Sequence, residues 1–258
     1  MDRDWINVRK PVFAGSFYPS SKEAVASFIG NLDAEDRPEK ESFSGGKPQQ
    51  VSGLIVPHAG WVYSGKTAMA AYRLLKGTLP GKIALLGPSH RLFLDTALGD
   101  DHDYWESPLG RTPVIHDPHF KNSAPSHARE HSLEVQLPFI QYFVPGCSIL
   151  PLVVGQLSVG QPETLVKGLL ENDYFLIIST DLSHFHSLEE ANKRDLKSIK
   201  KIEAVQENGV EACGIDPLRI AFAFMRENGL RPHLIDYSTS ANVSDDTSSV
   251  VGYASFWF

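Results

Sequence analysis

The sequence predicts an α/β protein whose central, mostly parallel sheet is flanked by helices. Apolar runs of strand length recur along the chain, and segments with helical spacing separate them. With 42% hydrophobic and 21% charged residues, the composition is ordinary for a globular protein with a full core. No break in composition divides the 258 residues, so we expect a single domain that spans residues 1–258.

Strands and helices are expected to alternate from residue 20 onward. Ser20 and Glu23 have the spacing of a capping box for a helix that ends near Leu32, and the polar residues 34–50 indicate a surface loop. The expected strands are 52–57, 82–90, 148–155, 175–184, 233–237 and 250–258, with short strands and turns between 92 and 114. The expected helices are 65–76, 130–137, 161–171, 187–208 and 216–228. Pro138 predicts a kink or an early stop in the helix that opens at Glu130.

Charge and cysteine content limit the compartment and the partners. The net charge of -7 argues against a nucleic-acid partner, because duplex binding needs a basic face. No apolar run approaches the roughly 20 residues that cross a bilayer, and residues 1–5 lack the features of a signal peptide. Two cysteines, Cys147 and Cys213, suit a reducing compartment. We therefore expect a cytoplasmic protein that binds neither nucleic acid nor membrane.

Histidines stand at the ends of the apolar runs. The segments LIVPH and ALLGPSH end at His58 and His90, with a helical segment between them. Such a spacing suits a βαβ unit, which places neighbouring parallel strands with their ends at one sheet edge. A later apolar run ends in Asp181 and His184. A single histidine is usually a satisfied loop or core residue, but this shared ending favours a functional cluster.

The residue types in this cluster suit a metal ion. Neutral imidazole is a common metal ligand, and two histidines with a carboxylate leave positions suited to Fe(II) and dioxygen, while zinc is equally permitted. His131 and Glu134 have i, i+3 spacing on a helix, which could hold a metal or simply pair the two side chains. The chain contains no HExxH, CxxC, GxSxG, P-loop or GxGxxG motif.

A set of motifs runs in order from Val12 toward the C-terminus: AGSFYP, VPHAGWVYSG, LLGPSH, EHSLEVQLPF, STDLSH and ACG. This combination resembles the Memo family, the protein B of the AmmeMemoRadiSam system. That family is similar in fold to the class III extradiol ring-cleavage dioxygenases of the LigB type. The resemblance implies one α/β domain with a pocket at the strand ends.

The resemblance also implies roles for particular residues. His58 and His90 fall on the two metal-binding histidines, and His184 falls on the histidine that acts as acid and base in the dioxygenases. Asp181 is its neighbouring carboxylate.

Two further residues of the EHSLEVQLPF motif, His131 and Glu134, would line the same pocket. The third metal ligand departs from the family pattern. Counting back from Ser248 places Asn242 where animal members carry cysteine and the dioxygenases carry glutamate. A neutral amide is a poor ligand for a divalent transition metal. Either Asp245 or Asp246 substitutes, or the metal is weakly held, or the site works differently.

Two functions remain open from the sequence. The first is a metal-dependent, dioxygenase-like oxidoreductase that uses Fe(II), with Cu or Zn as other candidates, on a small-molecule substrate. The second is a non-catalytic protein that uses the same His-rich pocket to hold a ligand or a phosphopeptide, since a helix N-terminus in such a pocket could hold an anion. The family name further implies Amme-type and radical SAM partner proteins.

Overall fold

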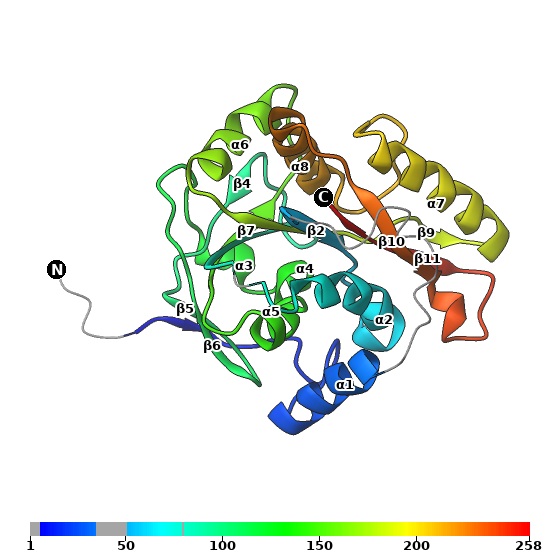
Figure 1. The fold of residues 1–258 in the computed structure, drawn as a ribbon, viewed down its shortest axis with the longest axis horizontal. Helices are drawn as coiled ribbons and strands as arrows, with labels where there is room; N and C mark the ends of the chain where they lie inside the picture. Colours follow the sequence, from blue (N-terminus) through cyan, green and yellow to red (C-terminus); the bar gives the residue numbers. More distant parts are fainter. Residues whose placement is uncertain (1–5, 35–50, 79) are drawn as a thin grey trace.

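An eight-stranded mixed sheet runs through the middle of the molecule (Figure 1). The computed structural model describes residues 6–34, 51–78 and 80–258, so the expected loop at 34–50 and the first five residues lie almost wholly outside the described parts. In spatial order the strands are β10 (His233–Thr239), β11 (Val250–Trp257), β2 (Gly53–Val56), β8 (Phe175–Ser179), β3 (Lys82–Pro88), β7 (Ser148–Val154) and β4 (Ala97–Leu98). A further strand, β9 (His184–His186), pairs with β11.

The four central strands, β2, β8, β3 and β7, are parallel, whereas β4, β11 and β10 are antiparallel to their neighbours. The predicted mixed α/β class, with a parallel centre, is therefore confirmed. Parallel strands at the centre of a sheet are buried on both faces, which explains their almost continuous apolar sequences.

One expectation about strand order was wrong. β2 and β3 are not direct neighbours, because β8 lies between them and Ile177 pairs with Leu54 on one side and Leu85 on the other. The sequence FLIIS of β8 has no outward-facing polar position before its last residue, as a central strand requires. The carboxyl ends of all three strands still meet at one edge of the sheet.

Helices cover both faces of the sheet (Figure 1). On one face lie α1 (Lys22–Ala34), α2 (Trp61–Tyr72) with the 3-10 turn η1 (Arg73–Leu75), α4 (His131–Glu134) and α5 (Leu137–Phe143). On the other face lie α6 (Gln161–Glu171), α7 (Leu188–Glu203) and α8 (Ile215–Asn228). Alternate strand residues supply the two cores: Leu54 and Val56 pack toward α2, while Ile55 packs toward α8.

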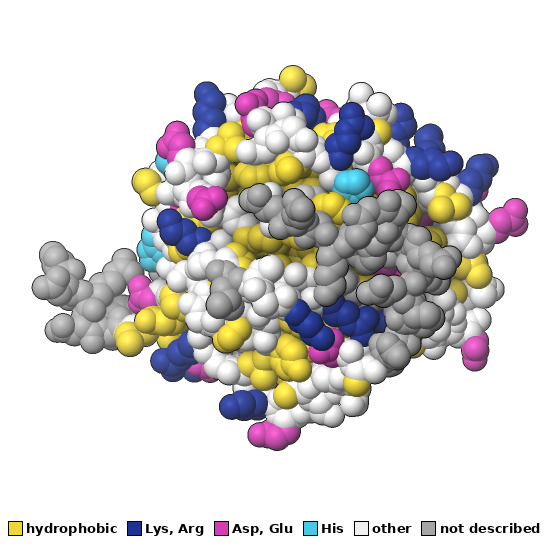
Figure 2. All heavy atoms as spheres, in the orientation of Figure 1, with side chains coloured by type: hydrophobic (Ala, Val, Ile, Leu, Met, Phe, Trp, Pro, Cys, Tyr) yellow, Lys and Arg dark blue, Asp and Glu magenta, His cyan; other side chains and the backbone are white. Residues whose placement is uncertain are grey.

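The remaining elements are short. β1 (Val8–Arg9), β5 (Tyr104–Ser107) and β6 (Gly110–Pro113) form a separate three-stranded sheet, and α3 (Ala124–His127) and η2 (Ser240–Asn242) are single turns. Among the described residues, no helix is long and apolar enough to cross a membrane. On the face drawn in Figure 2, charged side chains of both signs are scattered over the described surface and form no large basic patch.

Several predicted helix boundaries have identifiable causes in the structure. The break expected at Pro138 is present, since α4 ends at Glu134 and α5 begins at Leu137. The Ser187 side chain caps α7 by accepting from the Glu190 amide. At α1 the predicted cap is displaced by one residue, because the Ser21 hydroxyl accepts from the Ala24 amide.

Candidate metal centre

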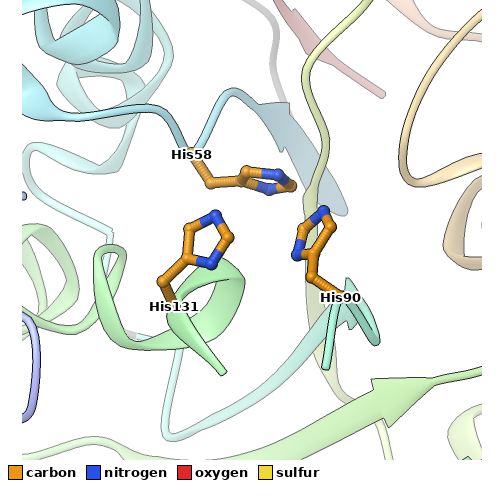
Figure 3. A group of neighbouring side chains, drawn as sticks. All are labelled: His58, His90 and His131. Atoms are coloured by element: carbon orange, nitrogen blue, oxygen red, sulfur yellow. The ribbon is translucent and has the colours of Figure 1, made fainter. Parts of the chain in front are cut away.

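Three imidazoles converge at the carboxyl edge of the parallel strands (Figure 3). His58 follows β2, His90 follows β3, and His131 is the first residue of α4. One potential ligand atom from each lies within 4.8 Å of the others. The rings of His90 and His131 are stacked with centroids 4.7 Å apart, and the ring of His58 stands edge-on to both. The structure thus brings the two strand-end histidines together with His131.

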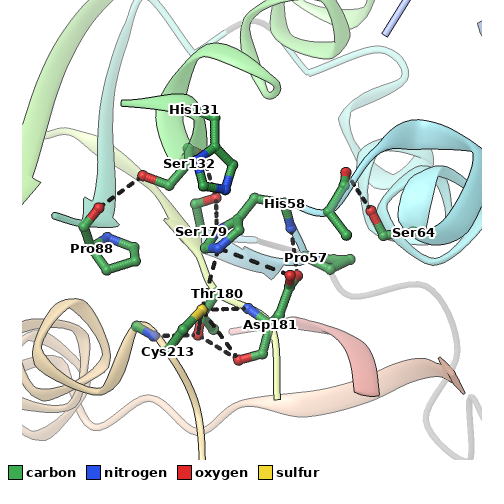
Figure 4. Close-up of polar contacts among 12 residues, drawn as sticks. Pro57, His58, Ser64, Pro88, His131, Ser132, Ser179, Thr180, Asp181 and Cys213 are labelled. Atoms are coloured by element: carbon green, nitrogen blue, oxygen red, sulfur yellow. Dashed lines mark hydrogen bonds and ion pairs between the residues drawn. The ribbon is translucent and has the colours of Figure 1, made fainter. Parts of the chain in front are cut away.

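The hydrogen bonds of the Ser179 hydroxyl determine which ring nitrogen of His58 carries the proton (Figure 4). The Ser179 hydroxyl donates to the Ser132 carbonyl at 2.6 Å and accepts from Gln136 Nε2 at 2.9 Å. A hydroxyl carries one proton, so His58 Nδ1, 3.0 Å away, must donate to the same oxygen. The lone pair of the neutral ring therefore lies on Nε2. Burial lowers the pKa of His58 well below its usual value, so the ring is neutral at pH 7.

Glu130 likewise determines which ring nitrogen of His90 carries the proton. Its carboxylate accepts from the His90 amide at 2.6 Å and from Nδ1 of the ring at 2.9 Å, and also from the Ser132 amide at 2.9 Å. Burial raises the pKa of Glu130, but these hydrogen bonds outweigh that effect and lower it to about 2. An ionised carboxylate only accepts, so Nδ1 of His90 donates and Nε2 is left for a ligand.

His131 carries a buried nitrogen that lacks a hydrogen bond. Its Nδ1 is inaccessible to solvent and has no hydrogen-bond partner among the described residues, although Glu130 Oε1 lies 3.4 Å away in poor geometry. Burial lowers the pKa of His131 to about 4. The rings of Phe13 and Phe17 pack against the imidazole with centroids 5.7 and 4.7 Å away. A neutral imidazole with a buried, unsatisfied nitrogen fits a metal ligand.

Asp181 contacts His58, and His184 follows it three residues later in the chain. Asp181 Oδ1 accepts from the His58 amide at 2.7 Å, and Oδ2 lies 4.0 Å from His58 Nε2. Burial raises the pKa of Asp181 to about 7, despite hydrogen bonds from the backbone of His58 and Ala59. His184 Nδ1 donates to the Leu182 carbonyl at 2.8 Å, which places its lone pair on Nε2. Burial lowers the pKa of His184 below its usual value.

Cys213 contacts His58 in the folded chain. Its Sγ is 3.2 Å from His58 Nε2 and accepts from the Asp181 amide at 3.3 Å. Burial, followed by the charge of Asp181, raises the pKa of Cys213 to about 12. The group is therefore a thiol rather than a nucleophilic thiolate.

Glu134 makes the contacts of an anchoring residue. Its fully buried carboxylate pairs with Arg9 at 2.7 Å and accepts from the amides of Val12 and Phe13 and from the Tyr18 hydroxyl. These partners belong to residues 9–18, the segment that carries Phe13 and Phe17 to the His131 ring. Glu134 thus acts on the pocket through the segment that it holds in place.

Asn242 is engaged elsewhere through its carboxamide oxygen. This oxygen accepts from the Thr239 amide at 2.8 Å and from the Thr239 hydroxyl at 3.2 Å. The residue also lines a cavity of about 760 Å³ beside Trp61. Asp245 and Asp246, the alternative third ligands, are exposed. The Asp246 carboxylate accepts hydrogen bonds from the amide and hydroxyl of Ser248 in its own loop. The role of Asn242 as third ligand stays a prediction, and His131 is the third member that the geometry supplies.

The residues that sequence reasoning missed are those that orient the imidazoles. Ser179 is the last residue of β8, and Glu130 directly precedes His131, so both had a positional signal at a strand end or a helix start. The signal was insufficient because their partners are distant in the chain.

The fold and the cluster together define a mixed α/β protein with a candidate metal centre at the strand ends. Residues 9–257 match the model of the Memo-like protein family. Relatives named as MEMO1 family proteins include one from Aquifex aeolicus, 34% identical over 98% of this chain and 100% of its own length. A relative from Methanobrevibacter smithii is 33% identical over 96% of this chain and 98% of its own length. A relative from Thermoplasma volcanium is 30% identical over 96% of this chain and 97% of its own length. The chain belongs to the Memo family.

Proposed function

We propose that this chain binds a divalent transition metal on His58, His90 and His131 and acts as a dioxygenase-like oxidoreductase. Fe(II) is the first candidate metal, with Cu and Zn as the others. The observation that carries this proposal is the convergence of three imidazole ligand atoms within 4.8 Å.

The donor set fits such a metal. Imidazole nitrogen suits iron, copper and zinc alike. Two of the rings present Nε2 because Ser179 and Glu130 hold their Nδ1 protons, and the third has a buried, unsatisfied nitrogen. Carboxylates that accept from metal-binding histidines orient the ring and increase its basicity. A bound Fe(II) would supply redox chemistry with dioxygen.

Asp181 and His184 are proposed to handle protons beside the cluster. A carboxyl whose pKa lies near 7 gains and loses a proton under neutral conditions, as a general acid or base must. For His184 the available atom is Nε2, because Nδ1 is committed to the Leu182 carbonyl. Asp181, in the loop after β8, and His184, in β9, thus each offer one proton acceptor.

Metal content of protein purified without a histidine tag tests the proposal. We expect His58→Ala, His90→Ala and His131→Ala each to lose most of the metal, because each removes one of the three imidazole donors of the cluster. His119→Ala is the matched control, since His119 pairs with Asp117 and Glu171 outside the cluster. If all three cluster variants retained the wild-type metal content, the metal site would have to be abandoned.

Asn242→Ala separates the two candidates for the third ligand. We expect this variant to keep its metal, because the amide oxygen of Asn242 serves Thr239. Metal loss in Asn242→Ala together with retention in His131→Ala would restore the assignment made from the sequence.

A further inference from the structure

Arg91 stands at the rim of the histidine cluster. It directly follows His90 in a turn beyond β3, and its side chain is exposed. The turn is fixed on both sides: the Ser89 hydroxyl donates to the Leu92 carbonyl at 2.6 Å, and the His90 amide donates to Glu130 at 2.6 Å. The backbone therefore holds Arg91 next to the centre rather than letting it move with a loose loop.

The Arg91 guanidinium has no hydrogen-bond or ion-pair partner among the described residues. Other arginines of the chain differ in this respect, because Arg9 pairs with Glu134 and Arg194 pairs with Glu211. Burial is the main cause of the lowered pKa of His131, and the positive charge of Arg91 lowers it further. An unpaired guanidinium offers five N–H donors in a planar fork that matches a carboxylate or a phosphate.

The charges of the centre require a negative ligand. A divalent metal brings two positive charges, and Arg91 adds a third. Glu130 supplies one negative charge while it accepts from His90 and Ser132, and Asp181 supplies a second when it is ionised, so one positive charge is left unbalanced. The packing of Phe13 and Phe17 against His131 makes one wall of the same centre apolar.

We propose that the substrate of this centre is a small acid with an apolar body, and that Arg91 receives its carboxylate. This inference rests on the proposed function, because it places the acid beside the metal-binding histidines. Arg91 determines specificity by contacting the charged end of the substrate, while the cluster faces the remainder.

The test uses benzoate, its neutral analogue benzamide, and inorganic phosphate as probes. Each is titrated calorimetrically into metal-loaded protein at low ionic strength, and the metal content of every sample is measured. We expect wild type to bind benzoate more tightly than benzamide. Arg91→Gln should weaken benzoate binding about ten- to hundredfold, as the loss of a charge-assisted hydrogen bond predicts, and leave benzamide unchanged. The benzoate affinity of Arg91→Lys should fall between those of wild type and Arg91→Gln, because a lysine keeps the charge but lacks the planar fork of donors.

Arg231→Gln is the control for a general change in charge. Arg231 is likewise exposed and without a partner among the described residues, but it precedes β10. The β10 residue His233 pairs with Trp257, which pairs with the first half of β2, so Arg231 lies at the opposite sheet edge from His58. We expect its removal to leave benzoate affinity unchanged.

The outcomes separate this inference from the proposed function. A wild-type protein that holds no metal contradicts the proposed function. Full metal content with benzoate affinity that is absent, or unchanged in Arg91→Gln, overturns the role of Arg91. Phosphate binding that depends on Arg91, without such benzoate binding, overturns the carboxylate assignment and points to a phosphoryl group.

Discussion

Neighbouring side chains decide which nitrogen each imidazole of the cluster presents. Ser179 does so for His58 by having no proton left to donate, and Glu130 does so for His90 by being ionised. Both hydrogen bonds hold the proton on Nδ1, so both rings leave the lone pair of Nε2 for a ligand. In the proposed metal site, affinity would therefore depend on residues that do not touch the metal.

Glu130→Gln tests this dependence at a single residue. The amide keeps the shape of the side chain but loses the charge, and it cannot accept from the His90 ring and backbone at once. We expect metal affinity to fall about ten- to hundredfold, as for other partners of metal-bound histidines. Competition with a chromogenic chelator measures the change. Glu106→Gln, on β5, is the control, and equal affinities in the two variants would contradict the role of Glu130.

At the scale of elements, the backbone of β11 at Gly252 lies directly against the side chain of Asp195 on α7. A Cβ on Gly252 would overlap the carboxylate of Asp195. That carboxylate is buried, accepts from the Ser183 amide at 3.0 Å and accepts from the Tyr237 hydroxyl at 2.9 Å. The segment from Ser183 to His184 is thus held by α7 and by β11 together.

Two glycine substitutions should shift stability in opposite directions. Gly252→Ala forces β11 from α7, and overpacking of this kind costs about 1–3 kcal/mol. Gly30→Ala places a methyl group in open space within α1, where alanine stabilises a helix by about 0.5–1 kcal/mol. Urea unfolding monitored by circular dichroism measures both. A Gly252→Ala protein as stable as wild type would show that the two elements can separate without cost.

Across the whole molecule, burial keeps several histidines neutral. It lowers the pKa values of His58, His127, His131 and His184 in the folded chain, with His131 at about 4. In the unfolded chain these rings take up protons as the pH falls through about 6.5. Their contribution to stability is therefore complete above that pH and is lost as the pH falls through their folded values. Asp181, whose pKa is raised, acts in the opposite direction.

We accordingly expect the metal-free protein to lose stability between pH 6.5 and pH 4. Four imidazoles outweigh one carboxyl, and each unmatched proton changes the slope by about 1.4 kcal/mol per pH unit. Urea unfolding at successive pH values measures the slope. His127→Gln, which lies outside the cluster, should make it shallower, whereas stability that rose on acidification would contradict the sign.

Local sequence patterns were sufficient to predict helices, strands and part of the candidate metal centre. The span of α6, the break before α5 and the histidines after β2 and β3 all follow from residues adjacent in the chain. The position of β8 between those strands does not, because strand order depends on pairing across more than 100 residues. The same limit applies to Ser179 and Cys213, which meet His58 only in the folded chain.

The central position of β8 also has a consequence for the order of synthesis. A growing chain that has not yet reached Phe175 already contains His58, His90 and His131 but lacks the strand that separates β2 from β3. It also lacks Ser179 and Asp181, which orient and flank His58. A chain of that length lacks the strand that orients the cluster, so the proposed metal site cannot be completed before β8 and Asp181 have been translated.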